Sequence, residues 1–170
     1  GRNFPTFRGF CSVQMDGGVV EGSVYGGGNR ASVFGSNAVQ VSGGSIGYIG
    51  DEHTNGALYG GNDRAGQVAQ ITNRVLPARY DVASDGQTNL KTIGVKTYVC
   101  ITGKPKVYTV YGGGNGAYTY TEDEYCDVTD KPVQSNTFVD VNIDAEGGID
   151  EGGYINKVYG GGNGVTVLDR

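Results

Sequence analysis

Val24-Tyr25-Gly26-Gly27-Gly28-Asn29 is the stretch that decides the fold, because nearly the same phrase returns three times, as Leu58-Tyr59-Gly60-Gly61-Asn62, Val110-Tyr111-Gly112-Gly113-Gly114-Asn115 and Val158-Tyr159-Gly160-Gly161-Gly162-Asn163. An apolar residue and an aromatic residue followed by glycines are typical of a strand that ends in a tight bend. Four copies in one chain predict a stack of similar units. The phrase contains no group able to run a reaction, so it informs on architecture more than on function.

A second phrase precedes each glycine phrase and alternates apolar with polar residues. Its copies are Val13-Gln14-Met15-Asp16-Gly17-Gly18, Val39-Gln40-Val41-Ser42-Gly43-Gly44, Val99-Cys100-Ile101-Thr102-Gly103 and Val141-Asn142-Ile143-Asp144. Alternation with a period of two predicts a strand with one buried face. We therefore expect the apolar members to point into the core, namely Val13, Met15, Val39, Val41, Val99, Ile101, Val141 and Ile143.

A third, looser strand is expected after each asparagine, at Ala31–Gly35, Gln67–Ile71, Ala117–Tyr120 and Val165–Val167. The smallest unit runs from Val13 to Val39 and contains three short strands, which is the content of one coil of a β-solenoid. We predict an all-β fold: a right-handed parallel β-solenoid (β-helix) of about four three-stranded coils. An all-β sandwich also has short strands and glycine turns, but it gives no reason for one phrase to recur.

The tyrosines of the glycine phrase are unequally spaced, which predicts loop insertions near residues 51–55, 72–96 and 121–135. A solenoid tolerates such excursions because loop-closure entropy rises slowly with loop length. Residues 1–170 are expected to form a single β-solenoid segment of a longer repeat protein. Because a new strand begins at Val165–Leu168, we expect further coils of the same protein or a neighbouring chain to cover that end.

Two ladders are the candidate functional features. If the apolar residue of each glycine phrase points inward, the next residue points outward, and stacking aligns Tyr25, Tyr59, Tyr111 and Tyr159 on one face. The asparagines are expected to form a turn ladder of Asn29, Asn62, Asn115 and Asn163, although Asn62 follows its tyrosine by one position fewer than the others. Both ladders have a structural interpretation, holding the coils in register. The tyrosine row also has a binding interpretation, as a platform for sugar rings or for another protein.

Composition and motifs argue against several function classes. The net charge is -5 with no basic cluster, which argues against nucleic-acid binding. No apolar run is long enough to span a membrane. His53 is the only histidine, interpreted as a lone surface-loop residue, and no metal-ligand spacing or nucleophile–base motif accompanies it. The acidic segments 122–130 and 144–151 are interpreted as solvated loops, with calcium binding left open. We predict no metal site, no cofactor, no catalytic residue and no enzymatic activity.

The glycine phrase with its preceding Val-x-Val-x-Gly-Gly strand resembles the glycine-rich repeats of large, adhesin-like β-helical surface proteins of gut Bacteroidota. The resemblance covers the repeated phrases, fails in the three insertions and brings no catalytic residues. It implies an extracellular or cell-surface location. The leading hypothesis is a non-enzymatic structural or adhesive repeat segment that binds a glycan or a host surface protein. Two alternatives stay open: a polysaccharide-active or polysaccharide-binding β-helix protein, and a rod component of a phage or fibre.

Overall fold

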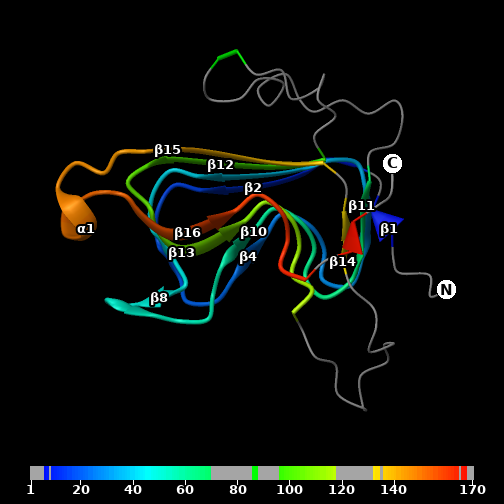
Figure 1. Cartoon of the computed structure of the whole chain (residues 1–170), viewed down its shortest axis with the longest axis horizontal. Helices are drawn as coiled ribbons and strands as arrows, with labels where there is room; N and C mark the ends of the chain where they lie inside the picture. The colour runs from blue at the N-terminus through cyan, green and yellow to red at the C-terminus, as the bar shows by residue number, and fades with distance from the viewer. Residues whose placement is uncertain are drawn as a thin grey trace.

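Short strands, nearly all of them parallel, make up about half of the part of the chain that the computed structural model describes. That part comprises residues 6–7, 9–69, 86–87, 96–117, 132–134, 136–164 and 166–167. The strands form three sheets in which every pairing is parallel. A separate antiparallel hairpin and one four-residue helix project from them. The expectation of an all-β fold with parallel sheets is confirmed (Figure 1).

Each sheet collects its strands from successive parts of the sequence. The first sheet has the order β15-β12-β6-β2, with β2 (Cys11–Met15), β6 (Asn37–Val41), β12 (Thr97–Gly103) and β15 (Thr137–Ile143). The second sheet contains β3 (Val19–Val20), β4 (Val24–Tyr25), β7 (Ser45–Ile46), β10 (Leu58–Tyr59), β13 (Lys106–Tyr111) and β16 (Tyr154–Tyr159). The third has the order β1-β5-β11-β14-β17, with β1 (Thr6–Phe7), β5 (Ser32–Phe34), β11 (Gly66–Ala69), β14 (Pro132–Gln134) and β17 (Thr166–Val167).

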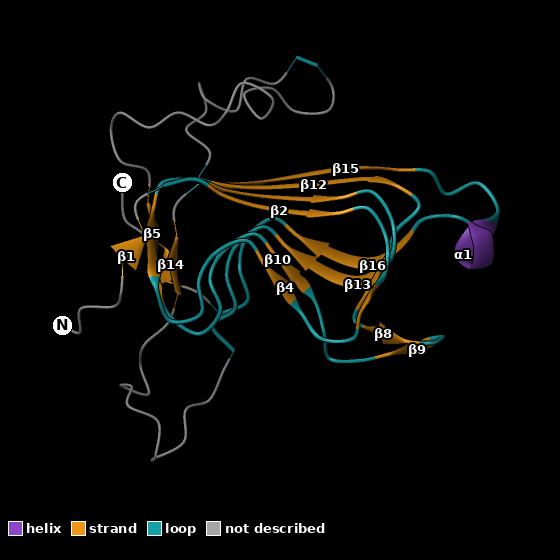
Figure 2. Ribbon diagram, turned by 180° about the vertical axis from the view of Figure 1, so that it is seen from behind, coloured by secondary structure: helices purple, strands orange, loops and turns teal. Residues whose placement is uncertain are grey.

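The chain visits the first, second and third sheets in the same order four times. We call these passages repeat 1 (residues 11–34), repeat 2 (37–69), repeat 3 (97–134) and repeat 4 (137–167). Figure 2 shows the turns between the second and third sheets nested one beside the next. Since neighbouring repeats are also neighbours in every sheet, each repeat is held by backbone hydrogen bonds to the repeats on either side.

The register aligns equivalent residues of successive repeats. Val13 pairs with Val39, and Val39 with Val99, as the predicted unit requires. In the fourth copy the prediction is wrong, because Val99 pairs with Val139 and Ile101 pairs with Val141. The second phrase of repeat 4 therefore begins two residues earlier than expected. A shift of two preserves the face of a strand, so Val141 keeps its face, but it is 40% exposed because β15 is the last strand of its sheet.

The main core lies between the first and second sheets. The predicted members Val39, Val41, Val99 and Ile101 are fully buried there, packed with Ile46, Leu58, Val107 and Val110. Val13, Met15 and Ile143 pack against this core and are partly buried. The expectation of a single buried face is too simple for the first sheet. Alternate residues of β6 and β12 face the other side, where a second cluster contains Ala38, Tyr98, Cys100, Phe10 and Phe138.

The third sheet departs from expectation in one repeat. Strands β5, β11 and β17 correspond to the strands predicted at Ala31–Gly35, Gln67–Ile71 and Val165–Val167. In repeat 3 the strand that pairs with β11 is β14, in place of the predicted Ala117–Tyr120, of which residues 118–120 lie outside those described.

Two excursions leave the sheets at the same end of the molecule (Figures 1 and 2). The hairpin of β8 (Tyr48–Ile49) and β9 (Glu52–His53) lies between β7 and β10, where the insertion near 51–55 was expected. Helix α1 (Gly148–Glu151) lies between β15 and β16 and was not expected. The insertions predicted near 72–96 and 121–135 fall almost entirely on residues outside those described.

Candidate functional site

The four tyrosines of the glycine phrase form one continuous stack. Tyr25 to Tyr59, Tyr59 to Tyr111 and Tyr111 to Tyr159 each have ring centroids 4.9 Å apart, with interplanar angles of 5°, 4° and 12°. The parallel register causes this, since it places the four residues side by side in the second sheet. Both faces of the Tyr59 and Tyr111 rings are covered by neighbouring rings, and Tyr59 is only 5% exposed. A ligand approaching the side of the stack meets ring edges and hydroxyls rather than flat ring faces.

The turn ladder exists, but one of its predicted members is wrong. Isolated parallel bridges join Asn29 to Asp63, Asp63 to Asn115, and Asn115 to Asn163. The second glycine phrase has not lost a residue: with Tyr25 paired to Tyr59, Asn62 stands where repeat 1 has Gly28, and Asp63 stands where it has Asn29.

The Asn62 side chain is fully buried and has a different role. Its Oδ1 accepts a 2.9 Å hydrogen bond from the Gly28 N–H, and its Nδ2 donates to the Ala31 carbonyl at 2.8 Å. Both partners belong to repeat 1, so the Asn62 side chain supports the glycine turn of the neighbouring repeat.

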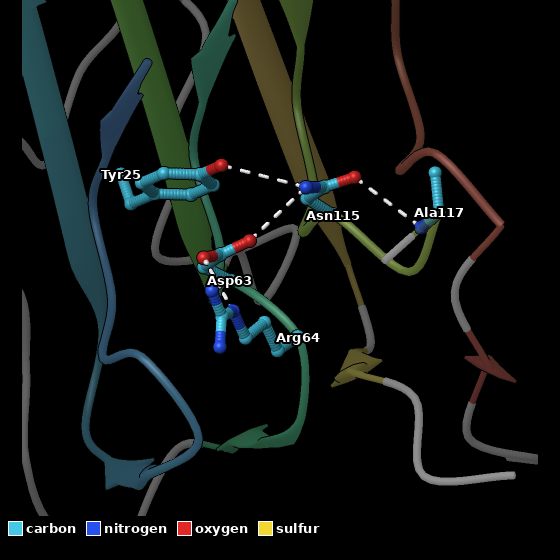
Figure 3. A network of polar contacts seen from close by, with 5 residues as sticks. All are labelled: Tyr25, Asp63, Arg64, Asn115 and Ala117. Atoms are coloured by element: carbon cyan, nitrogen blue, oxygen red, sulfur yellow. Dashed lines mark hydrogen bonds and ion pairs between the residues drawn. The ribbon is translucent and has the colours of Figure 1, made fainter. Parts of the chain in front are cut away.

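The tyrosine stack and the turn ladder are joined by hydrogen bonds (Figure 3). Asn115 Nδ2 donates to Asp63 Oδ1 at 3.0 Å and contacts Tyr25 Oη at 3.4 Å, while Asn115 Oδ1 accepts from the Ala117 N–H at 3.3 Å. Asp63 also pairs with Arg64, at 3.6 Å. Tyr25 belongs to repeat 1 and Asn115 to repeat 3, so this contact crosses an entire intervening repeat.

Three hydroxyls of the stack have raised pKa values. Burial raises the pKa of Tyr59 to about 12, against an opposing hydrogen bond with Asn163. Burial is also the main cause of the raised pKa values of Tyr25 and Tyr111. Phenols with raised pKa values stay protonated at neutral pH. This arrangement suits hydrogen bonding and packing and supplies no base or nucleophile.

A third set of polar contacts was missed at the sequence level. Inside the molecule, Thr97 Oγ1 donates to the Gly112 carbonyl at 2.8 Å and Asn37 Nδ2 to the Gly60 carbonyl at 3.4 Å. In repeat 4, Thr137 Oγ1 donates to the exposed Gly160 carbonyl. The three donors are register partners in the first sheet. The available signal was a polar residue two positions before the aligned valines at 39, 99 and 139.

A pocket of about 240 Å³ lies between the two excursions. We call it the insertion pocket and define it by Tyr48, Asp51, Lys106, Ile149, Asp150 and Tyr154. These residues come from the hairpin of repeat 2, from β13 of repeat 3, and from α1 and β16 of repeat 4. Lys106 pairs with Ser45 on one side and with Tyr154 on the other, so the start of β13 lies between the hairpin and α1.

Aromatic rings support one wall of the insertion pocket. Tyr48 is almost fully buried and meets Tyr108 edge to face, with centroids 6.1 Å apart. His53, exposed in β9, stacks on the same Tyr108 ring at 4.1 Å. The expected lone surface histidine is therefore exposed, and it takes part in an aromatic cluster that holds the hairpin against the second sheet.

Asp51 and Asp150 are far apart in the chain, and no local sequence pattern predicts that they lie in the same pocket. Within the described residues, no three His, Cys, Asp or Glu side chains are grouped so that they can hold a metal ion. No helix in that same part of the chain has the length and apolar character needed to cross a membrane. The chain matches no protein-family model, no curated protein and no solved structure.

Proposed function

We propose that this chain is a non-enzymatic segment of a right-handed parallel β-solenoid at a cell surface, where it acts as a rigid structural element that adheres to glycans or to a protein partner. The solenoid assignment is supported by the fixed order of first, second and third sheet in four repeats and by their parallel register. The right hand is supported by the general preference of parallel crossover connections.

The main support for the structural role is the tyrosine stack together with the glycine turn beside it. Backbone hydrogen bonds continue through the turn, from Gly26 N–H to the Tyr59 carbonyl and from Gly60 N–H to the Tyr111 carbonyl, at 2.9 and 3.0 Å. A Cβ atom at Gly60 would collide with the carbonyl of Gly112, so glycine permits this approach. Repeats that contact only their neighbours form an extended, quasi-one-dimensional body.

The outer side of repeat 4 is where we place the partner. Val141, Val158 and Tyr159 are large hydrophobic residues exposed there, at 40%, 47% and 47%. Among the described strands, β15 is the last of the first sheet, so its outer edge is where a further strand would be added. A further coil of the same protein, or a neighbouring chain with the same phrase, would place a tyrosine on Tyr159 and continue the ladder.

The location and the adhesive role rest on the resemblance of the glycine phrase to adhesin-like surface repeats. Two measurements test them. Antibodies against this chain should label intact producing cells, and beads coated with the folded chain should adhere to mucin-coated surfaces without releasing sugar from them. Labelling only after lysis, or steady release of reducing sugar, would overturn the proposal.

A further inference from the structure

The insertion pocket is the strongest unassigned feature of the molecule. We propose that it binds one ring of a neutral glycan. This deepens the glycan-binding part of the proposed function and rests on it.

The position of the pocket favours a binding site over a packing gap. Insertions in repeat proteins leave the regular frame as loops on one face, and binding residues concentrate on loops that a rigid scaffold positions. Here the hairpin and α1 are both such insertions, and β13 runs between them without interruption. In repeat 1 the connections equivalent to the hairpin and to α1, residues 21–23 and 16–18, are short links. Two excursions from repeats 2 and 4 thus enclose a floor provided by repeat 3.

The side chains suit a sugar in their chemistry. A pyranose ring has an apolar C–H face and a belt of hydroxyls that both donate and accept hydrogen bonds. Tyr154 is only partly buried and provides aromatic surface with a hydroxyl at the tip, while the almost fully buried Tyr48 also lines the pocket. Asp51 and Asp150 accept hydrogen bonds, and Lys106 donates them.

The charges select a neutral ligand. Lys106 disfavours a bound cation, and the two carboxylates disfavour a bound phosphate or uronic acid. Burial, with smaller contributions from Tyr154 and Tyr108, raises the pKa of Tyr48. The Tyr48 hydroxyl therefore remains a hydrogen-bond donor at neutral pH.

The size of the pocket limits the ligand to one ring. Its volume of about 240 Å³ is below the roughly 300–1,000 Å³ of pockets that enclose drug-sized molecules. Tyr48 is held by Tyr108 before any ligand arrives, which lowers the entropic cost of binding. Asp51, Ile149 and Asp150 are exposed at the mouth, so the rest of a glycan chain can continue into solvent.

The test uses the whole 170-residue chain, labelled with ¹⁵N. The probes are tetrasaccharides of glucose, mannose, xylose, galactose and N-acetylglucosamine, with tetralysine and a galacturonic acid tetramer as charged probes. We expect at least one neutral probe to shift the amide signals of Lys106, Ile149 and Tyr154. Tyr154→Ala removes aromatic surface and Asp150→Asn removes a charged hydrogen-bond acceptor, and each change should weaken that binding by about tenfold.

A control variant separates pocket effects from general ones. Asp16→Asn removes an exposed carboxylate near the end of β2, outside the pocket, and should bind the probe as the unmodified chain does. Both pocket variants should keep the thermal melting profile of the unmodified chain, because Asp150 is exposed and Tyr154 is only partly buried.

Three results would overturn the proposal that the insertion pocket binds a neutral glycan. They are the absence of pocket shifts with every neutral probe, unchanged affinity in both Tyr154→Ala and Asp150→Asn, and preferential binding of either charged probe. If those variants lose no bead adhesion, the adhesive function stands and the pocket assignment fails. If a neutral probe binds at the pocket and is cleaved, the pocket stands and the non-enzymatic proposal fails.

Discussion

The Thr97 hydroxyl donates a 2.8 Å hydrogen bond to the carbonyl oxygen of Gly112, joining a strand of the first sheet to the glycine turn of the same repeat. Thr97 is fully buried, and Gly112 is buried as well. The carbonyl faces the interior of the molecule, where water is excluded, and the hydroxyl satisfies it. Asn37 makes the equivalent buried contact in repeat 2, and Thr137 makes an exposed one in repeat 4. In repeats 2 and 3 the glycine turn is therefore supported from inside as well as by the ladders.

Replacing Thr97 by valine should lower the free energy of unfolding by about 1–3 kcal/mol, because a buried carbonyl loses its hydrogen-bond donor while the side-chain volume hardly changes. Urea denaturation followed by circular dichroism measures the loss. Thr97→Ser keeps the hydroxyl and is the matched control, which should retain most of the stability. Unchanged stability of Thr97→Val, or a larger loss in Thr97→Ser than in Thr97→Val, would contradict the role of the hydrogen bond.

Gly112 and Gly160 occupy the same position of the phrase but differ in their surroundings. A Cβ atom at Gly112 would collide with the carbonyl of Gly160, whereas nothing lies within 4 Å of one at Gly160. We expect Gly112→Ala to destabilise the protein by roughly 1–3 kcal/mol through overpacking, and Gly160→Ala to leave the melting temperature close to that of the unmodified chain. Similar melting temperatures for both variants would contradict the close stacking of the turns.

The tyrosine stack predicts a loss of stability in alkali. The folded chain raises the pKa of Tyr59 from 10.0 to about 12 by burial, so between these values the unfolded chain releases a proton that the folded chain retains. This stabilisation is fully present below the unfolded pKa and is lost as pH rises through the folded one. Denaturation midpoints measured from about pH 8 to about pH 12 should fall across the upper part of that range.

Tyr59→Phe is the control for the alkaline effect, since it keeps the stacked ring and has no ionisable hydroxyl. Its midpoints should fall less steeply, while a remaining slope is expected from the raised pKa values of Tyr25 and Tyr111. Identical slopes with and without the Tyr59 hydroxyl would show that it does not titrate as inferred.

Ile101 lies at the centre of the main core and is fully buried. Ile101→Asp should abolish cooperative melting, because an unpaired buried carboxylate costs several kcal/mol, comparable to the roughly 5–15 kcal/mol that stabilises a whole domain. Val19→Asp places the same charge on an exposed residue of β3 and should fold normally. A cooperative transition of Ile101→Asp at the original temperature would exclude the core assignment.

The local pattern was sufficient for the repeat, the strands of the first sheet and the stacked tyrosines. The valines of the second phrase alternate with polar residues, and the glycine phrase recurs around a fixed tyrosine. A parallel register that buries Val39 and Val99 therefore also aligns Tyr59 and Tyr111. Period-two alternation specifies which face of a strand is apolar, but a shift of two residues along the strand leaves that face unchanged. The alternation therefore could not show that the fourth copy begins at Val139 rather than at the predicted Val141.

The features that only the tertiary structure decided involve residues far apart in the chain. The turn ladder contains Asp63 and not the predicted Asn62, which became evident only from the pairing of Tyr25 with Tyr59. The second buried face of the first sheet depends on Phe10 and Phe138, which are far apart in sequence. The insertion pocket depends on the stacking of repeats 2, 3 and 4, which brings Asp51 and Asp150 to one cavity. Local alternation encodes which face of a strand is apolar, whereas contacts between distant residues exist only once backbone hydrogen bonds have set the register of the repeats.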